Sequence, residues 1–444
     1  MRARAFDGRR LHFVGIGGAG MSGLALVARE LGAEVTGSDR SDSSYCERLR
    51  RSGIKPRIGH DAANLPSGAE VVVSTAIPED NPELVAARER GAPILHRGDL
   101  LGEVSRLKRT IAVGGTHGKT TTASMAALIL LECRRDPGFL IGGELRAADA
   151  NAGWGAGEWA VIEADESDRS FLKLGREVAV VTSVELDHHS TYRSLAELKR
   201  AFAAFAAPAA VTVLGPEVEP VGGGEEVRYG IGKGDLRAER LELLPLGSRF
   251  VVDGATVELA VPGAHNALNA LAALAACRAA GVEPADAAPA LARFTGAGRR
   301  FEERGRTAGG ACVFDDYAHH PTEVRATLEA ARTLAPRRLV ACFQPHLYSR
   351  TRALAREFGR ALALADLVVV LEVYPARERA EDFPGVSGLT VAAAAADAAG
   401  GRPVWWLPRM DEAERLLREE LREGDLLLTL GAGDVDELAR RLVA

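Results

Sequence analysis

The sequence has few cysteines, and those it has are scattered. Five occur among 444 residues, and no two of them form a Cys-x-x-Cys pair. An odd and dispersed set disfavours a disulfide framework and a zinc site, and it fits reduced thiols in a cytoplasm. We therefore expect a cytoplasmic protein.

Long apolar runs and an excess of positive charge are also missing. The longest apolar stretch, near residues 201–214, is rich in alanine and is broken by Pro208, so we expect no membrane span. The short glycine-rich stretch 11–20 is not followed by a small-residue cleavage site, which disfavours a signal peptide. The formal net charge of −6 gives no reason to expect a nucleic acid or an anionic membrane as a partner.

The residues that are present can fill several hydrophobic cores. The composition, 47% hydrophobic and 26% charged, is that of a globular protein, and the length predicts two to four domains. Apolar runs predict buried strands near 11–14, 34–36, 70–74, 110–113, 159–162, 178–182, 211–214, 311–314, 339–343, 367–371, 404–407 and 426–430. Helical patterns alternate with them, which indicates parallel sheets covered by helices. Only the segment 218–261 predicts short antiparallel strands. We expect an α/β protein with domains at 1–107, 108–296 and 297–444.

A first glycine-rich loop joins the strand at 11–14 to a helix predicted over 21–31. Its glycines are Gly15, Gly17, Gly18 and Gly20, and Asp39 ends the next strand about 20 residues further on. In this context the glycines permit a tight turn, backbone N–H groups face a diphosphate, and the acid is placed for a ribose hydroxyl. The pattern predicts diphosphate binding but leaves the ligand open, because NAD and a UDP-sugar both carry a diphosphate.

A second glycine-rich loop, of a different design, lies between the strand at 110–113 and a helix predicted over 122–131. It is not a strict Walker A sequence, because Val113 stands six positions before Lys119. The expected chemistry is nevertheless the same: N–H groups wrap phosphate oxygens, Lys119 neutralises the transferred phosphate, and Thr120 reaches Mg²⁺. Two phosphate loops disfavour a simple dehydrogenase. We expect one loop to hold a nucleotide-linked substrate and the other a nucleoside triphosphate.

Acidic residues follow two of the predicted central strands. Glu163, Asp165 and Asp168 come after the strand at 159–162, and Asp187 and His188 come after the strand at 178–182. Parallel sheets bind ligands at the carboxyl ends of their strands, and carboxylate oxygens are suitable ligands for Mg²⁺. We therefore expect a metal site beside the triphosphate, with a solvated acidic loop as the alternative.

Polar residues also follow strands in the last third of the chain. Tyr317 and His319 come after one strand, and Arg350 and Arg352 come after the next. Such residues make a plausible pocket for a small carboxylate, which an arginine can bind through two hydrogen bonds. Separately, Asn266 opens an alanine-rich helix, where it either contacts an adenine or ribose or caps the helix.

Taken together, these motifs resemble those of the Mur ligases. The matching stretches are Gly-Thr-His-Gly-Lys-Thr-Thr at 115–121, Glu-Ala-Asp-Glu-Ser-Asp at 163–168, Asp-His at 187–188, His-Asn-x-x-Asn at 265–269 and Arg-Arg-Phe at 299–301. The stretches at 14–23, 315–323 and 344–352 look like the branch that joins L-alanine to the lactyl carboxylate of UDP-N-acetylmuramate. The resemblance covers essentially the whole chain.

The resemblance implies an α/β fold of three domains. These would be a Rossmann-like domain for the UDP-substrate, a central P-loop ATPase-type domain, and a Rossmann-like domain that brings the amino acid. It also implies ATP as a substrate, Mg²⁺ or Mn²⁺ as the metal, and peptidoglycan precursor synthesis through an acyl phosphate. We expect no membrane and no nucleic acid as partners, and a monomer or a homodimer.

The resemblance also implies roles for individual residues. ATP would be bound by Gly115, Thr116, His117, Gly118, Lys119, Thr120, Thr121 and Asn266; the metal by Thr120, Glu163 and His188; the UDP-substrate by Gly15, Gly17, Gly18, Gly20 and Asp39; and the amino acid by Tyr317, His319 and Arg350 or Arg352. Lys119 would be catalytic, and His188 or His319 is the candidate to take the proton of the amine. Some relatives carry a carbamylated lysine where this chain has Ala203, so we expect no carbamate.

Three alternative functions are weighed against the same motifs. A recycling ligase would attach a whole peptide to the same sugar nucleotide. A folylpolyglutamate synthetase would lack the first glycine loop. A regulator could keep the fold without turnover, although the joint presence of Lys119, Glu163 and His188 argues against this.

Overall fold

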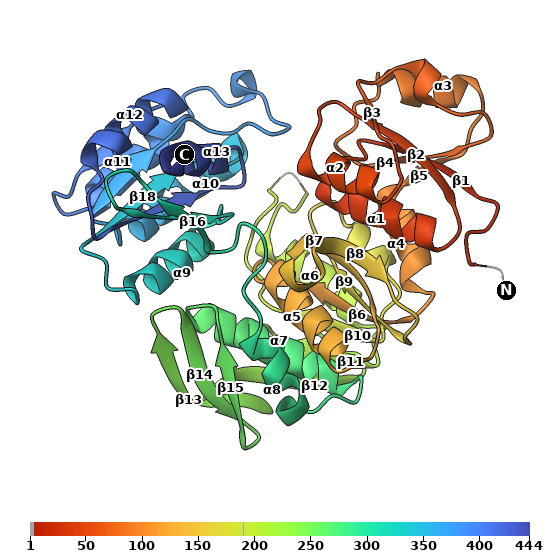
Figure 1. The fold of residues 1–444 in the computed structure, drawn as a ribbon, viewed down its shortest axis with the longest axis horizontal. Coiled ribbons are helices and arrows are strands. Elements are labelled where there is room, and N and C mark those ends of the chain that lie inside the picture. The colour runs from red at the N-terminus through yellow and green to blue at the C-terminus, as the bar shows by residue number, and fades with distance from the viewer. Residues whose placement is uncertain (1–3, 190) are drawn as a thin grey trace. The chain divides into compact units, whose positions relative to one another are not determined.

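The computed structural model describes residues 4–189 and 191–444, in which strands and helices alternate along most of the chain (Figure 1). The chain divides into two compact units. Unit 1 comprises Met1–Glu185, Leu195–Arg237 and Asn269–Ala290, and unit 2 comprises Leu186–Ser194, Ala238–Leu268 and Leu291–Ala444.

Unit 1 begins with a five-stranded parallel sheet in the order β3-β2-β1-β4-β5. Its strands are β1 (Arg10–Val14), β2 (Glu34–Asp39), β3 (Arg57–Ile58), β4 (Glu70–Val73) and β5 (Ile94–His96), and its helices are α1 (Ala19–Glu30), α2 (Ser44–Arg51), η1 (Ala62–Asn64), α3 (Pro82–Glu89) and α4 (Arg97–Ser105). Leu11, Phe13 and Val14 of β1 are buried, as in a parallel sheet covered on both faces. The first strand and helix therefore confirm the prediction, with the helix starting two residues earlier.

The central strands of unit 1 lie in the order β12-β11-β10-β6-β9-β7-β8. They are β6 (Arg109–Gly114), β7 (Gly138–Leu145), β8 (Ala150–Trp154), β9 (Trp159–Glu163), β10 (Val178–Val181), β11 (Val211–Leu214) and β12 (Glu225–Ile231), with α5 (Lys119–Glu132), η2 (Arg146–Ala148), η3 (Ser170–Lys173) and α6 (Leu195–Ala206). The helices α7 (Ala264–Arg278) and α8 (Pro284–Ala292) lie mostly in unit 1, but the start of α7 and the end of α8 belong to unit 2. The prediction of antiparallel strands does not hold for the pairing of β12 with β11, which is parallel. The loop 215–224 returns the chain to the start of β11, which a parallel pair requires.

Unit 2 contains an antiparallel β-meander and a six-stranded sheet. The meander consists of β13 (Leu236–Leu244), which begins at the boundary of the units, β14 (Gly247–Val252) and β15 (Ala255–Leu259). The sheet has the order β16-β17-β21-β18-β19-β20 and is parallel except for β16. Its strands are β16 (Glu302–Arg306), β17 (Cys312–Asp316), β18 (Arg338–Phe343), β19 (Leu367–Val370), β20 (Val404–Trp406) and β21 (Asp425–Leu430), and its helices are α9 (Pro321–Arg332), α10 (Tyr348–Leu362), η4 (Ala380–Asp382), α11 (Gly388–Ala398), α12 (Met410–Glu420) and α13 (Asp436–Val443).

The six-stranded sheet has a hydrophobic core on each face. Along β18, Leu339, Ala341 and Phe343 belong to the core packed under α9, α10 and α11, whereas Val340 and Cys342 belong to the core under α12 and α13. Successive side chains of a strand point to opposite faces, so a strand that is apolar throughout must be covered on both sides. This explains why the sequence pattern of these strands is continuous rather than alternating.

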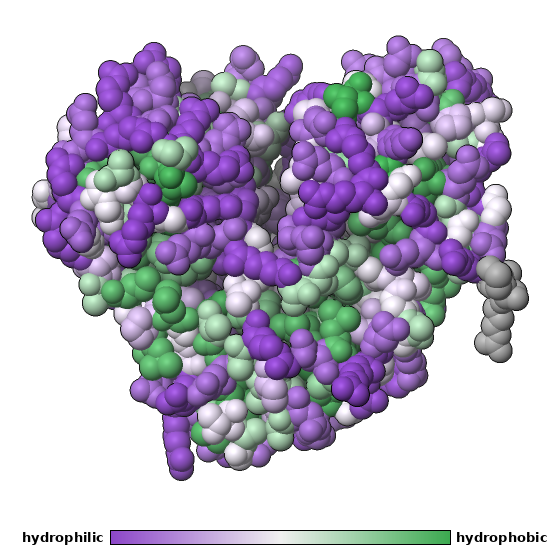
Figure 2. Space-filling model, in the orientation of Figure 1, coloured by the Kyte–Doolittle hydropathy of each residue, from purple (hydrophilic) through white to green (hydrophobic). Residues whose placement is uncertain are grey.

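Hydrophilic residues cover most of the face of the molecule seen in Figure 2. Among the described residues, no helix is both long enough and apolar enough to cross a membrane.

A buried carboxylate organises the carboxyl end of β2. The side chain of Glu83, on α3, is fully buried and lies 3.0 Å from His12 Nε2. It accepts hydrogen bonds from Ser38 Oγ at 2.6 Å, from Asn64 Nδ2 at 3.0 Å and from the backbone N–H of Asp61 at 3.2 Å. Burial alone would raise the pKa of Glu83, but the hydrogen bonds from His12, Asn64 and Ser38 lower it to about 2.

Glu83→Gln should therefore destabilise the protein in a pH-dependent way. Because the folded pKa lies below the ordinary value of 4.5, the ionised carboxylate stabilises the fold above that pH, and the contribution is lost as the pH falls toward 2. We expect a loss of about 3 kcal/mol near neutral pH, measured by urea unfolding, and a smaller difference from wild type below pH 4.5. Glu79→Gln is the control, since Glu79 forms only an exposed ion pair with Arg88. A difference that does not shrink at low pH would contradict the assignment.

Candidate functional site

The second glycine loop connects β6 to α5 and can contain only glycine at two positions. Gly115 and Gly118 have φ of +127° and +80°, a region that side chains disfavour. A Cβ on Gly115 would lie 2.0 Å from Thr182 Oγ1, and one on Gly118 would lie 2.3 Å from Asn269 Oδ1. The loop therefore presents backbone N–H groups at the start of a helix, where an anion binds favourably.

Lys119 is held inside this loop by its own backbone and by an acid. Its Nζ donates to the carbonyl oxygens of Gly115 at 2.6 Å and Thr116 at 3.1 Å, and lies 2.9 Å from Glu166 Oε2. Burial alone would lower the pKa of Lys119, but Glu166 and the neighbouring acids raise it above its ordinary value. The ammonium is therefore charged and lies beside the N–H groups that would receive a phosphate.

Glu163, at the end of β9, lies beside Thr120 of the phosphate loop. Its Oε1 accepts a hydrogen bond from Thr120 Oγ1 at 2.9 Å, and its Oε2 accepts one from Gly142 N at 2.7 Å. Burial raises the pKa of the Glu163 carboxyl. A half-buried carboxylate next to a hydroxyl is a pair of hard oxygen donors that suits Mg²⁺.

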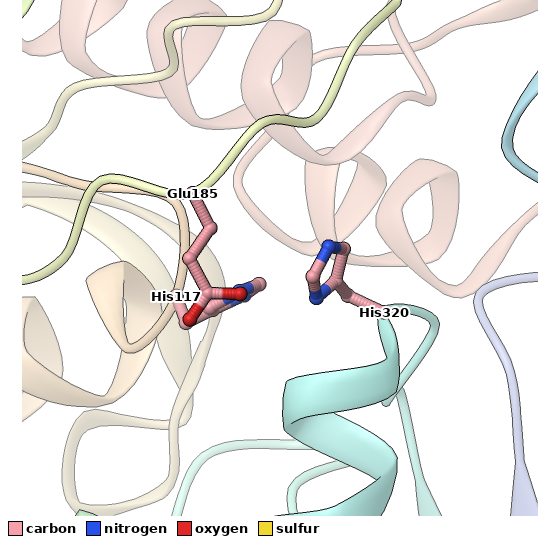
Figure 3. A group of neighbouring side chains, drawn as sticks. All are labelled: His117, Glu185 and His320. Atoms are coloured by element: carbon pink, nitrogen blue, oxygen red, sulfur yellow. The ribbon is translucent and has the colours of Figure 1, made fainter. Parts of the chain in front are cut away.

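His117 points away from the phosphate loop toward the segment after β10. Figure 3 shows its imidazole beside the carboxylate of Glu185, with Nε2 and Oε2 3.4 Å apart. The backbone N–H of His117 donates to Ser183 Oγ at 3.0 Å. His320, which is also labelled in Figure 3, caps the start of α9 in unit 2.

The first glycine loop is stabilised by the acid that was predicted to contact a ribose. Asp39 Oδ2 accepts a hydrogen bond from Gly17 N at 2.8 Å, and its Oδ1 accepts one from Ser41 N at 3.2 Å. Gly18 precedes α1 without a side-chain cap, and Gly20 lies in the first turn of the helix. The helix start is thus available to an anion, while the ribose contact of Asp39 stays a prediction.

The acids Asp165 and Asp168 have a partner that the sequence did not indicate. Both accept hydrogen bonds from Arg97 Nη2, at 3.3 Å and 3.2 Å. The sequence could have singled out Arg97 by the same rule as the other site residues, because it directly follows β5 at the carboxyl end of that strand. Both acids are therefore paired with a cation, although the Asp165 side chain is also 41% exposed.

In unit 2, Arg350 of α10 forms a buried, two-point ion pair with Asp187. Arg350 is 2% exposed, and its Nε and Nη2 donate to the two carboxylate oxygens of Asp187, each at 2.9 Å. Its Nη1 lies 3.1 Å from His346 Nδ1. Burial alone would raise the pKa of Asp187, but the Arg350 guanidinium holds it well below its usual range. Arg350 was predicted to bind the carboxylate of a substrate, and in this structure it binds the carboxylate of Asp187 instead.

Asp187 also sets the backbone of His188. His188 has a φ of +53°, and its N–H donates to Asp187 Oδ1 at 2.7 Å. The His188 carbonyl accepts from Thr191 N at 2.7 Å and from Tyr192 N at 3.0 Å. Glu163 belongs to unit 1 and His188 to unit 2, so a metal shared by them stays a prediction.

The rings of His346, His319 and Tyr317 form a cluster beside Arg350. The ring of His346 lies 5.8 Å from that of His319, which in turn lies 5.4 Å from Tyr317. His319 Nδ1 is 2.8 Å from the Tyr317 carbonyl oxygen, and burial lowers the pKa of His319 to about 4. The structure therefore brings Tyr317, His319 and Arg350 together as predicted, with a neutral imidazole among them near pH 7.

Two other predicted residues lie elsewhere. Arg352 is exposed, with its guanidinium 5.0 Å from the ring centre of Phe383. Residues two apart on a helix face different sides, so Arg350 and Arg352 cannot both join the ring cluster. Asn266 does not cap α7, because it lies inside the helix and its Nδ2 donates to the Pro262 carbonyl at 2.7 Å. Its predicted adenine contact remains untested.

Three family models match the chain in succession. They are the Mur ligase family catalytic domain over residues 10–109, the Mur ligase middle domain over 113–277, and the Mur ligase glutamate ligase domain over 299–433.

Individual relatives are similar over nearly the whole length. The UDP-N-acetylmuramate–L-alanine ligase of Streptomyces coelicolor is 48% identical, over 98% of this chain and 97% of the relative. The enzyme of the same name from Acidithiobacillus ferrooxidans is 45% identical, over 97% and 96%.

Solved structures show the same likeness. The UDP-N-acetylmuramate–alanine ligase of Thermotoga maritima has a TM-score of 0.84 at 31% identity, with 98% of both chains covered. A murein peptide ligase of Psychrobacter arcticus has a TM-score of 0.74 at 27% identity, also with 98% of both chains covered.

Lys119→Ala should greatly slow turnover with ATP while the chain stays folded. Removing one preorganised charge at a phosphate costs roughly 10²- to 10³-fold in kcat, which phosphate release can measure. Because the substitution leaves Glu166 buried without its cation, Lys119→Ala/Glu166→Gln is the matched variant, with circular dichroism to monitor folding. Turnover by the double variant close to that of wild type would show that Lys119 has no catalytic role.

Proposed function

This chain belongs to the Mur ligase family, and we propose that it uses ATP to join L-alanine to the lactyl carboxylate of UDP-N-acetylmuramate. The observation that carries the proposal is identity of 41–48% over nearly the full length to relatives named for this reaction. The reaction would supply a peptidoglycan precursor in the cytoplasm. The recycling alternative has weaker support, since the murein peptide ligase of Psychrobacter arcticus is 27% identical.

The proposed chemistry begins with activation of a carboxylate, which does not react with an amine unaided. The γ-phosphoryl group of ATP moves to the lactyl carboxylate, giving an acyl phosphate and ADP. The neutral amine of alanine then attacks the acyl carbon, and phosphate leaves as the amide forms. Lys119 and the backbone N–H groups at the start of α5 would stabilise the negative charge during phosphoryl transfer.

A divalent metal fits the acidic side of the phosphate loop. Thr120, Glu163 and His188 would hold Mg²⁺ or Mn²⁺, which would neutralise phosphate charge when bound. The support for this is the half-buried carboxylate of Glu163, which accepts a hydrogen bond from the Thr120 hydroxyl. The UDP-substrate would be bound by the Gly15–Gly20 loop and the start of α1.

The ring cluster of unit 2 would bind the amino acid. Arg350 offers a cation for the carboxylate, and Tyr317 and His319 lie near it through His346. His319 has a neutral imidazole, which can accept the proton that the attacking amine gives up. Since Asp187 occupies Arg350 in the substrate-free chain, the substrate carboxylate would replace Asp187 on at least one guanidinium nitrogen.

The direct test is phosphate release from ATP with UDP-N-acetylmuramate and a panel of acceptors. We expect turnover with L-alanine and slower turnover with glycine and L-serine, because the site needs an ammonium, a carboxylate and a small side chain. The tripeptide L-alanyl-γ-D-glutamyl-diaminopimelate serves as the acceptor of the recycling reaction. Turnover with the tripeptide and none with L-alanine would exclude the proposal.

Arg350→Ala should weaken alanine binding selectively. Loss of a charged hydrogen bond costs about 1.5–3 kcal/mol, which raises the KM for alanine roughly ten- to a hundred-fold. The KM for UDP-N-acetylmuramate should change little. Arg352→Ala, on the exposed side of the same helix, is the control and should behave like wild type. Equal effects of Arg350→Ala on both KM values would assign Arg350 to the fold alone.

A further inference from the structure

Arg97 joins two parts of unit 1 that carry different loops of the proposed site. It is the first residue of α4, directly after β5 in the five-stranded sheet, whereas Asp165 and Asp168 lie in the acidic loop after β9 of the central sheet. Its Nη2 donates to both acids, at 3.3 Å and 3.2 Å. The side chains of Asp168 and Arg97 are 7% and 24% exposed, so this pair is largely shielded from water, whereas Asp165 is 41% exposed.

The two acids are bound on both of their oxygens. Asp165 Oδ1 accepts from Ser167 N and Asp168 Oδ1 accepts from Ser170 N, each at 2.9 Å. Their Oδ2 atoms face Arg97. One oxygen of each acid therefore holds the shape of the loop, and the other attaches the loop to α4.

The other terminal nitrogen of the guanidinium, Nη1, faces the first glycine loop. A Cβ on Gly20 would lie 2.8 Å from Arg97 Nη1, so the arginine packs directly on the first turn of α1. Gly20 cannot be replaced by a larger residue without moving Arg97. The guanidinium thus contacts the loop proposed for the diphosphate with Nη1 and the acidic loop with Nη2.

A cavity of about 210 Å³ lies where these elements meet. Gly20, Arg97, Glu163 and Asp165 line its polar part, and its other walls are mainly apolar side chains of α1, α4 and the central sheet. A substrate whose diphosphate lies at Gly20 and whose carboxylate lies near Glu163 must pass Arg97. Burial alone would lower the pKa of Arg97, but Asp165 and Asp168 raise it, so the side chain stays charged.

We propose that Arg97 is a positioning residue that holds the acidic loop, with Glu163 and Glu166, in register with the glycine loop of the sugar nucleotide. The inference rests on the proposed function for the identity of that substrate. Glu163 contacts Thr120 and Glu166 contacts Lys119, so a displaced loop would misplace both groups of the phosphoryl-transfer site. A planar guanidinium can bridge two carboxylates, whereas a lysine at position 97 could bind only one of them well.

The first experiment compares Arg97→Ala with Arg106→Ala by steady-state kinetics. Arg106, at the end of the same helix, donates to the Lys173 carbonyl at 2.8 Å and meets no acid of the loop. Arg97→Ala should lower kcat roughly ten- to a hundred-fold, as misplaced catalytic groups do, with the Kd for ATP within about two-fold of wild type. Arg97→Lys should recover only part of the rate. Arg106→Ala should resemble wild type, and an equal effect of both alanine variants would overturn the proposal.

The acids provide a second kinetic test. If Arg97 acts through Asp168, Asp168→Asn should also lower kcat, and the double variant Arg97→Ala/Asp168→Asn should be no slower than Arg97→Ala alone. Independent, multiplied losses would mean that the two residues do not act as a unit and would overturn the proposal.

Hydrogen exchange tests the attachment of the loop without any substrate. Arg97→Ala should speed amide exchange at Ser167 and Ser170, whose N–H groups bind Asp165 and Asp168, while Arg106→Ala leaves it unchanged. Unchanged exchange in Arg97→Ala would overturn the proposal. If wild type fails to turn over UDP-N-acetylmuramate with alanine, the proposed function is wrong, and the exchange rates still decide the role of Arg97.

Discussion

In the central sheet, the ammonium of Lys119 is enclosed by two carbonyl oxygens of its own loop and by the buried carboxylate of Glu166. The rest of the site depends on this arrangement. Lys119 follows β6 and Glu166 follows β9, and these strands are paired in parallel, so both loops emerge at the same edge of the sheet. The ion pair holds the two loops together where Glu163 meets Thr120. An unpaired charge in that place would be costly, which keeps the loops in register.

The second unit uses a similar arrangement. Arg350 and Asp187 are buried and bound at two points, and Asp187 in turn supports the left-handed backbone of His188. In both places a charge that would meet a substrate is satisfied by a side chain of the chain itself. A buried pair of this kind adds little net stability, because desolvation offsets the attraction, but it specifies one geometry. The site is thereby ordered before its substrates arrive.

Much of the fold could be predicted from the sequence because it depends on short-range patterns. The strands β1, β6, β9 and β18 lie where apolar runs placed them, and both glycine loops lie between a strand and a helix. The antiparallel prediction failed for the pairing of β12 with β11, because the pattern of a strand is the same whichever way its neighbour runs. The short edge strands β3 and β5 were not predicted, because two or three residues carry too little periodicity to be distinguished from a loop.

The sequence by itself determined where the local motifs lie: the glycines that a phosphate loop requires, Lys119 between a strand and a helix, and Glu163 at the end of a buried strand. Local spacing carries this information, because a tight turn or a strand end is formed by residues adjacent in the chain. Only the tertiary structure decided which charges meet. Lys119 and Glu166 are 47 residues apart, Arg97 and Asp165 are 68 apart, and Arg350 and Asp187 are 163 apart. Acids and arginines are common along the chain, so no spacing rule selects a partner. The order of the strands in the sheets and the packing of the helices bring one particular acid within hydrogen-bonding distance of each cation.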